Sequence, residues 1–124
     1  MVDAVESLVR QSLLVVVDPP AGHPIAGSPR LVMLKTVREF ALERLVASGE
    51  EAEVRRRHAA WCLALAERQA LAVLEPDGER VLALLEAEHD NLRAALTWLD
   101  TAGDPAAFLR LAVALGRFWR GRGY

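Results

Sequence analysis

Cysteine and long apolar runs are nearly absent from this sequence of 124 residues. Cys62 is the only cysteine, which excludes an intrachain disulfide and a metal site made of four cysteines. The apolar run Leu13–Val17 is far shorter than a signal-peptide core or a membrane span. We therefore expect a cytoplasmic protein that makes no contact with a membrane.

The sequence also lacks a large excess of charge of one sign and a phosphate-binding loop. The formal net charge is −2, which indicates neither a polyanion binder nor an acidic tail. The pattern GxxxxGK(S/T), whose backbone amides cradle phosphates, does not occur. We expect this segment to bind no ATP or other cofactor and no metal.

Apolar material is abundant. Hydrophobic residues make up 52% of the chain and charged residues 26%, which is sufficient for a packed core and argues against disorder. The length allows one ordinary domain or two small modules.

The first part of the chain predicts a helix, a strand, a loop and a second strand. Apolar residues recur at helical spacing from Val2 to Gln11, and the β-branched run Leu13–Val17 is typical of a short buried strand. Four of the six prolines lie in Asp18–Pro29, which predicts a surface loop. Arg30–Leu34 can return as the second strand of a hairpin.

Two helices are expected next. The first ends at Ser48-Gly49, where glycine can take the left-handed cap conformation, and its apolar positions are Val37, Phe40, Ala41 and Leu45. The second runs from Glu51 to Leu74 with an apolar stripe of Val54, Trp61, Leu65 and Ala72. Pro76-Asp77-Gly78 interrupts it, and Asp77 can cap the following helix.

The remainder is predicted to be helical. The polar patch Glu88–Asn91 interrupts an apolar pattern that stays in phase, which favours one long, kinked helix with Val81, Leu85, Leu92, Leu96 and Leu99 on its apolar face. Gly103-Asp104-Pro105 combines a glycine stop, an Asp cap and a proline at the first helical position. The last helix then presents Phe108, Ala112, Leu115 and Trp119 on one face, widened by Leu111 and Phe118.

The predicted fold class is therefore mainly α, with a helix, a two-stranded wing and a helix followed by antiparallel helical pairs. The last helix runs almost to the end of the sequence, so its far partner is missing. Such a pattern suggests the beginning of a repeat array, although the sequence is too short to show a period.

Nearly the whole chain resembles a stretch of large bacterial STAND-class transcriptional regulators of the LuxR and SARP types. The matching runs are Leu8–Leu14, Met33–Ala41, Arg57–Ala59, Glu86–Trp98 and Phe118–Gly123. The resemblance implies that residues 1–49 are the C-terminal part of a winged-helix-like module and that residues 50–124 begin a tetratricopeptide-like sensor. It also implies an ATPase domain upstream, so that this chain is a fragment and ATP binds only outside it.

The expected site residues are structural or interaction residues, and none is catalytic. They are Glu88, Asn91, Arg93, Trp98, Phe108, Leu115 and Trp119. Glu88 lies between Leu85 and Leu92 on the apolar stripe, where an unpaired charge is costly. We expect it to be a partly buried carboxylate that receives a hydrogen bond from an arginine or a free backbone amide.

Three other groups of residues suggest chemistry but have a simpler interpretation. His58 and Cys62 are spaced as half of a zinc site, yet no second pair accompanies them, so we expect a packed cysteine beside a histidine. His89 and Asp90 lack a nucleophile with an orienting partner. Arg55-Arg56-Arg57 stands among glutamates and predicts a solvated helix surface rather than a phosphate site.

The arginines of the last helix have no acidic neighbour after Asp104, which makes them the better candidate for binding an acidic partner; they are Arg110, Arg117, Arg120 and Arg122. Arginine stems lying along apolar neighbours explain them equally well. The expected wing has no lysine or arginine in Asp18–Pro29, so direct binding to nucleic acid is not expected.

Our function hypothesis is a non-catalytic interaction and signal-relay segment of a larger ATP-dependent transcriptional regulator. Its expected partners are the upstream ATPase switch domain and the downstream helical repeats, together with a second copy of the chain through the last helix. The alternative is a stand-alone winged-helix DNA-binding module. An enzyme with a helical active site is the weakest hypothesis.

Overall fold

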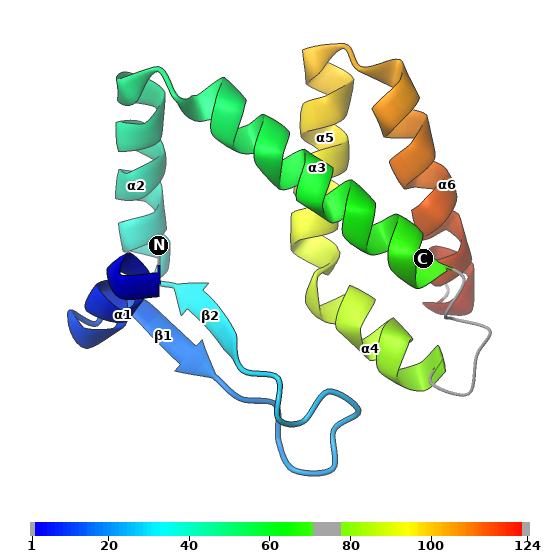
Figure 1. Ribbon diagram of the computed structural model, residues 1–124, viewed down its shortest axis with the longest axis horizontal. Coiled ribbons are helices and arrows are strands. Elements are labelled where there is room, and N and C mark those ends of the chain that lie inside the picture. Colours follow the sequence, from blue (N-terminus) through cyan, green and yellow to red (C-terminus); the bar gives the residue numbers. More distant parts are fainter. Residues whose placement is uncertain (1, 71–77, 123–124) are drawn as a thin grey trace. The chain divides into compact units, whose positions relative to one another are not determined.

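The computed structural model describes the backbone of residues 2–70 and 78–122, and the side chains of residues 3–70 and 78–120 (Figure 1). Its elements are α1 (Val2–Arg10), β1 (Leu14–Val17), β2 (Arg30–Met33), α2 (Lys35–Ser48), α3 (Glu51–Ala70), α4 (Gly78–Ala87), α5 (His89–Ala102) and α6 (Pro105–Arg122). The predicted fold class, mainly α with one two-stranded hairpin, is confirmed. The chain forms two compact units, Met1–Glu51 (unit 1) and Ala52–Tyr124 (unit 2).

Unit 1 is built on the hairpin. The chain leaves α1 through Ser12, whose φ of 61° turns the backbone into the first strand, and the amide of Leu13 donates to the carbonyl of Leu8 at 2.9 Å. The strands are antiparallel, and the paired residues are Leu14 with Met33, Val15 with Val32, Val16 with Leu31 and Val17 with Arg30.

The expectation that the first strand is buried is wrong. Val15, Val16 and Val17 are 41–48% exposed, and their partners Leu31 and Val32 are equally open. Neighbouring residues of a strand point to opposite faces, so both faces of this hairpin are apolar. A buried strand needs a layer on each face, and among the described residues of unit 1 only Ile25 is buried.

The proline-rich segment between the strands forms turns, as predicted. It contains Ile25, which is only 4% exposed and was not recognised from the sequence. The amide of Ile25 donates to Nδ1 of His23 at 3.3 Å, and the amide of Ala26 donates to the carbonyl of His23 at 2.9 Å. These local hydrogen bonds stabilise the turn in which Ile25 lies.

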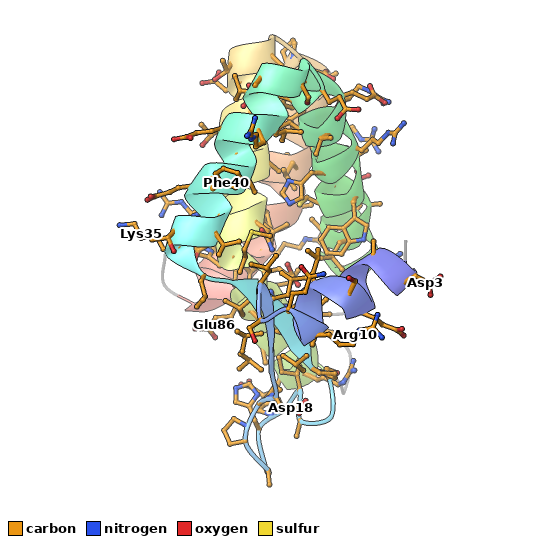
Figure 2. The ribbon with its side chains drawn as sticks, turned by 90° about the vertical axis from the view of Figure 1, so that its left-hand side faces the viewer. Asp3, Arg10, Asp18, Lys35, Phe40 and Glu86 are labelled. Carbon is orange, nitrogen blue, oxygen red and sulfur yellow. The ribbon has the colours of Figure 1, made fainter. Side chains whose placement is uncertain are left out.

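Helix α2 ends as predicted. Gly49 has a φ of 78°, and its amide donates to the carbonyl of Val46 at 3.1 Å, so this position requires a residue that tolerates the left-handed conformation. The helix buries no residue. Phe40 is 58% exposed, and the Arg44 guanidinium lies 5.3 Å from the centre of its ring; Figure 2 shows Phe40 on the outside of α2.

Unit 2 contains the hydrophobic core, which α3, α4, α5 and α6 share. The residues that α3 buries in this core differ from the predicted apolar stripe. Leu65 is buried, but Val54 and Trp61 are 44% and 51% exposed, and Ala72 lies outside the described residues. The buried face of α3 consists of Ala59, Cys62, Leu65 and Ala66, three of which are small and allow the helix to approach its neighbours closely.

The prediction of one long helix across residues 81–99 is wrong, because α4 and α5 are separate helices that meet at Glu88. Glu88 has φ −93° and ψ 4°, which is outside the helical range. A straight helix over residues 78–102 would be about 37 Å long, whereas the 18 residues of α6 span about 27 Å. The bend at Glu88 keeps both Leu85 and Leu92 in the same core, where each is 1% exposed.

The turn between α5 and α6 has the predicted caps. Gly103 has a φ of 74°, Asp104 Oδ1 accepts a hydrogen bond from the amide of Ala107 at 3.1 Å, and Pro105 is the first residue of α6. Figure 1 shows α5 and α6 side by side as an antiparallel pair.

The buried face of α6 is rotated from the predicted one. Leu115 is buried as expected, but Phe108, Ala112 and Trp119 are only partly buried. Leu111 and Phe118, which were expected to widen an uncovered face, are fully buried, and the exposed large apolar residues of α6 are Leu109 and Val113. The uncovered apolar surface of this helix is therefore on a different side from the one the sequence suggests.

Replacing the cap residue of α6 tests this turn. We expect Asp104→Ala to lower the free energy of unfolding by about 1 kcal/mol, because the amide of Ala107 loses its acceptor. Asp104→Asn retains a side-chain oxygen and should change it by only a few tenths. Urea unfolding followed by circular dichroism measures the free energy of unfolding of both variants. Equal losses in the two variants would show that the hydrogen bond from the amide of Ala107 to the side chain of residue 104 does not stabilise the helix.

Candidate functional site

The buried polar cluster of unit 2 lies where α4 meets α5. Glu88 is 9% exposed and is the one charged residue buried among those described. Asn91 Nδ2 donates to Glu88 Oε2 at 2.8 Å, and the amide of Leu92 donates to the carbonyl of Glu88 at 2.9 Å. One donor to the carboxylate is thus the side-chain amide of Asn91, which the sequence analysis had marked as a structural residue without naming this role.

Cys62 of α3 packs on the same cluster. Its Sγ lies 3.7 Å from His58 Nε2 and donates to the carbonyl of Asn91, also at 3.7 Å. Burial, together with the smaller effect of the negative charge of Glu88, raises the pKa of the Cys62 thiol to about 11. A thiol with a raised pKa is mostly protonated at neutral pH, which lowers its reactivity as a nucleophile. Among residues 3–70 and 78–120, no group of three or more His, Cys, Asp or Glu is placed to hold a metal.

The raised pKa of Cys62 predicts a loss of stability in alkali. The unfolded thiol ionises near pH 9 and the folded one near 11, so the folded chain retains a proton that the unfolded chain releases. The free energy of unfolding should therefore fall between pH 9 and 11, by on the order of 2 kcal/mol. Urea unfolding at pH 8 and pH 10.5 measures the fall. The matched variant Cys62→Ala should lack this component, and an equal fall in the variant would contradict the assignment.

Arg93, Phe108 and Trp119 lie together at a hollow between α5 and α6. Its volume is about 310 Å³, and its lining residues are Arg93, Leu96, Thr97, Asp100, Phe108 and Trp119. Nε1 of Trp119 is buried and has no hydrogen-bond partner among the described residues. The sequence marked these three residues separately, and the antiparallel packing of α5 against α6 joins them.

The other two expected residues have packing positions. Leu115 is fully buried in the core of unit 2. Trp98 is partly buried and packs against that core, where it lines a hollow of about 370 Å³ together with Ala59, Leu63 and Ala107. Neither residue contacts the polar cluster at Glu88 through a hydrogen bond.

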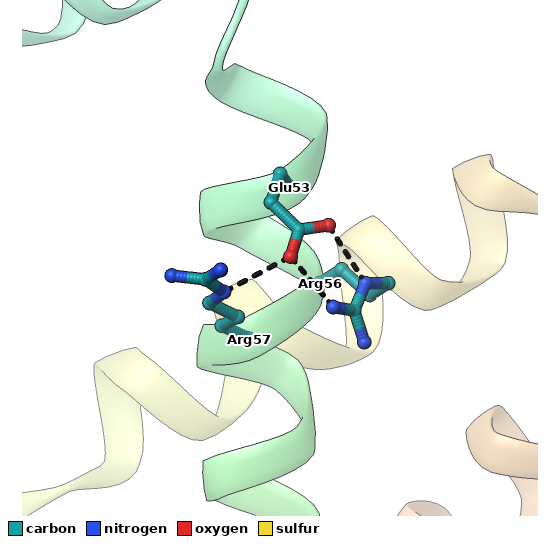
Figure 3. Close-up of polar contacts among 3 residues, drawn as sticks. All are labelled: Glu53, Arg56 and Arg57. Carbon is teal, nitrogen blue, oxygen red and sulfur yellow. Dashed lines mark hydrogen bonds and ion pairs between the residues drawn. The ribbon is translucent and has the colours of Figure 1, made fainter.

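The charged first turns of α3 form a solvated surface, as predicted. Figure 3 shows Glu53 between Arg56 and Arg57. Its Oε1 lies 2.7 Å from Nη2 of Arg56 and 2.9 Å from Nε of Arg57, and the three side chains are 49–75% exposed. Hydrogen bonds from Arg56 lower the pKa of Glu53 to about 2. Arg56 and Arg57 thus both pair with the single carboxylate of Glu53 on an exposed helix surface, which favours the solvated-surface interpretation over a phosphate site.

A groove between α3 and α6 was not recognised from the sequence. It has a volume of about 420 Å³ and is lined by Glu67, Ala70, Leu109, Arg110, Val113, Ala114 and Arg117. Leu109 and Val113 are 60% and 74% exposed, and Nε of Arg110 donates to Glu67 Oε2 at 3.2 Å. The spacing of Leu109 and Val113, four residues apart beside arginines, was the signal that could have shown it.

Comparison with known proteins connects this fold with transcriptional regulation. Over all 124 residues the chain is 38% identical to proteins provisionally named HTH-type (helix-turn-helix) transcriptional regulators, from Mycobacterium bovis and from two strains of Mycobacterium tuberculosis. The chain spans 13% of the length of each of these relatives. It is therefore similar to one segment of a much longer regulator.

No family model matches the sequence, and no solved structure matches it. Across the described residues, every helix is too short or too polar to cross a membrane.

Proposed function

We propose that this chain is a non-catalytic interaction and signal-relay segment of a larger, cytoplasmic, ATP-dependent transcriptional regulator of the STAND class. The observation that carries the proposal is the similarity of the whole chain to a short part of longer regulators. In this proposal residues 1–49 end a winged-helix module that docks on the ATPase switch domain, and residues 50–124 begin a tetratricopeptide-like sensor.

The apolar surface of unit 1 supports a docking role. The hairpin exposes apolar residues on both faces, and Leu34 and helix α2 add further exposed ones; together they are Val15, Val16, Val17, Leu31, Val32, Leu34, Phe40 and Val46. Ile25 is the one buried apolar residue among the described residues of unit 1. Exposed apolar patches of this kind mark protein interaction sites, so the unit is suited to pack against another protein surface.

The polar clusters of unit 2 support a non-catalytic role. The buried thiol of Cys62 is held protonated by its surroundings. The carboxylate of Glu88 accepts a hydrogen bond from Asn91 at the junction of two helices, which is a structural use.

The alternative, a stand-alone DNA-binding winged helix, is favoured by the HTH-type names of the relatives. The charge of unit 1 opposes it, because that unit contains five basic and seven acidic residues. DNA binding requires cationic contacts to phosphates and weakens steeply with salt. Fluorescence anisotropy with a random-sequence duplex at about 50 and 200 mM salt separates the hypotheses: a salt-dependent complex supports the alternative, and no complex supports the relay role.

The relay role is tested on the parent protein. A phosphate-binding loop is expected within about 300 residues upstream of this segment, the length of one or two domains. In the full-length regulator, hydrogen exchange of β1, β2 and α2 should slow or quicken when ATP replaces ADP. An upstream sequence without that loop, or identical exchange in both nucleotides, would refute the relay role.

The isolated 124-residue chain should not bind ATP, because it has no phosphate-binding loop. Titration calorimetry of the chain with ATP and magnesium is expected to give only heats of dilution. Binding with a micromolar dissociation constant would show that nucleotide recognition occurs within this segment.

A further inference from the structure

The groove between α3 and α6 has a floor and a rim of different character. Ala70, Leu109, Val113 and Ala114 make the floor apolar, and Glu67, Arg110 and Arg117 contribute the charged groups around it. Val113 is 74% exposed, although it is an aliphatic residue in the middle of a helix whose opposite side is fully buried. This floor is an apolar surface that the described part of the chain leaves open.

The charge of the rim is positive. Glu67 is already ion-paired with Arg110, so these two side chains neutralise each other. Within residues 3–70 and 78–120, Arg117 makes no ion pair. From Pro105 to the end of the sequence there are four arginines and no acidic residue. A partner that enters the groove therefore meets a net positive rim.

The spacing of the lining residues fits a helix. Leu109 and Val113 are four residues apart and lie on one side of α6, where the side chains of a second helix can pack between them. Arg110 and Arg117 are two turns apart, about 10.5 Å along the axis. Carboxylates at the same separation on an adjacent helix would face both guanidinium groups.

We propose that this groove binds an acidic amphipathic helix of a partner protein, with aliphatic side chains on the floor and carboxylates facing Arg117 and Arg110. The inference rests on the proposed function, since it names the chemistry of one partner of the relay segment. It does not depend on ATP or on the upstream domain, so binding can be measured with the 124-residue chain alone.

The probe is a fluorescein-labelled peptide of about 18 residues, long enough to form a helix. It carries leucines at i, i+3, i+4 and i+7, with glutamates on both sides of that stripe. Two further peptides have the same leucines, with glutamine or lysine in place of glutamate. Anisotropy should show saturable binding of the glutamate peptide, at least tenfold weaker binding of the glutamine peptide, and none of the lysine peptide.

Variants of exposed residues locate the site without disturbing the core. Val113→Glu should abolish binding of the glutamate peptide, because it places a charge on the floor. Arg117→Glu should weaken it about tenfold, equivalent to 1.4 kcal/mol, and should allow the lysine peptide to bind. Arg80→Glu makes the same charge change on an exposed residue of α4 that does not line the groove, and should leave binding unchanged. Circular dichroism confirms that each variant is folded.

Three results would overturn the proposal. Equal binding of the glutamate and glutamine peptides would show that the rim selects nothing. Equal effects of Arg117→Glu and Arg80→Glu would show that binding depends only on total charge. A dimer detected by light scattering and dissociated by Val113→Glu would assign the groove to a second copy of the chain, the self-association through the last helix that the sequence suggests. Each of these outcomes leaves the upstream ATPase test of the relay role unaffected.

Discussion

Phe118→Ala is expected to destabilise unit 2 by about 3–5 kcal/mol, the cost of truncating a fully buried aromatic side chain. Phe118 is 0% exposed, and its ring packs at 60° to the ring of His89 with the centroids 6.3 Å apart. The substitution removes core contacts from α6 and leaves a cavity between it and α5. For a domain of ordinary stability this is a large part of the total.

The measurement is urea unfolding followed by circular dichroism at 222 nm. Val113→Ala, five residues earlier on the same helix, provides the control because Val113 is 74% exposed, and such surface changes usually alter stability by no more than about 0.5 kcal/mol. If the two substitutions cost the same, α6 does not pack on α5 in solution as described.

Glu88→Ala is expected to cost on the order of 3 kcal/mol, the usual effect of breaking a buried charged interaction. The substitution removes a carboxylate that is only 9% exposed and accepts the hydrogen bond of the Asn91 side chain. Glu88→Gln retains an oxygen for Asn91 and should cost less. It also removes the negative charge near Cys62, so it should lower the pKa of that thiol toward its ordinary value.

Glu86→Ala is the control for this series, since Glu86 is an exposed carboxylate two residues earlier, in α4. Its effect on thermal and urea unfolding should be small, as for most surface charges. A melting temperature of Glu88→Ala equal to that of Glu86→Ala would show that Glu88 is solvated rather than part of the packing.

Local signals in the sequence predicted local structure well. Gly49 and the run Gly103-Asp104-Pro105 end and begin helices where expected, because each conformation is determined by the residue itself and its nearest hydrogen bonds. The hairpin was also recognised, from two apolar runs around a proline-rich loop.

Burial was predicted less well, because it depends on which surfaces meet. Trp61 has the size of a core residue, yet α3 turns Cys62 and Ala66 inward and leaves Trp61 half exposed. The break at Glu88 could not be deduced from periodicity, since Leu85 and Leu92 are in phase whether the helix is straight or bent. The bend is favoured instead by the length of the neighbouring helix α6, which is shorter than a straight helix over residues 78–102 would be.

For the candidate sites, too, local features were predicted well and contacts between distant residues were not. Glu88 was singled out correctly as a buried carboxylate because its position on an apolar stripe is a local property. The hollow that joins Arg93 to Phe108 and Trp119, and the groove that places Glu67 against Arg110, connect residues far apart in the sequence. Such pairings follow from the packing of helices, which one sequence without its structure does not specify.

The junction between α4 and α5 consists of Glu88 alone, so the two helices are connected without a flexible linker. Figure 1 shows that α4 leaves α5 at a sharp angle there. Any change in the angle between α4 and α5 therefore has to be accommodated by the backbone torsions at Glu88, the residue whose carboxylate accepts the hydrogen bond from Asn91. The relative orientation of the two helices and this one side-chain hydrogen bond are thus set at the same residue.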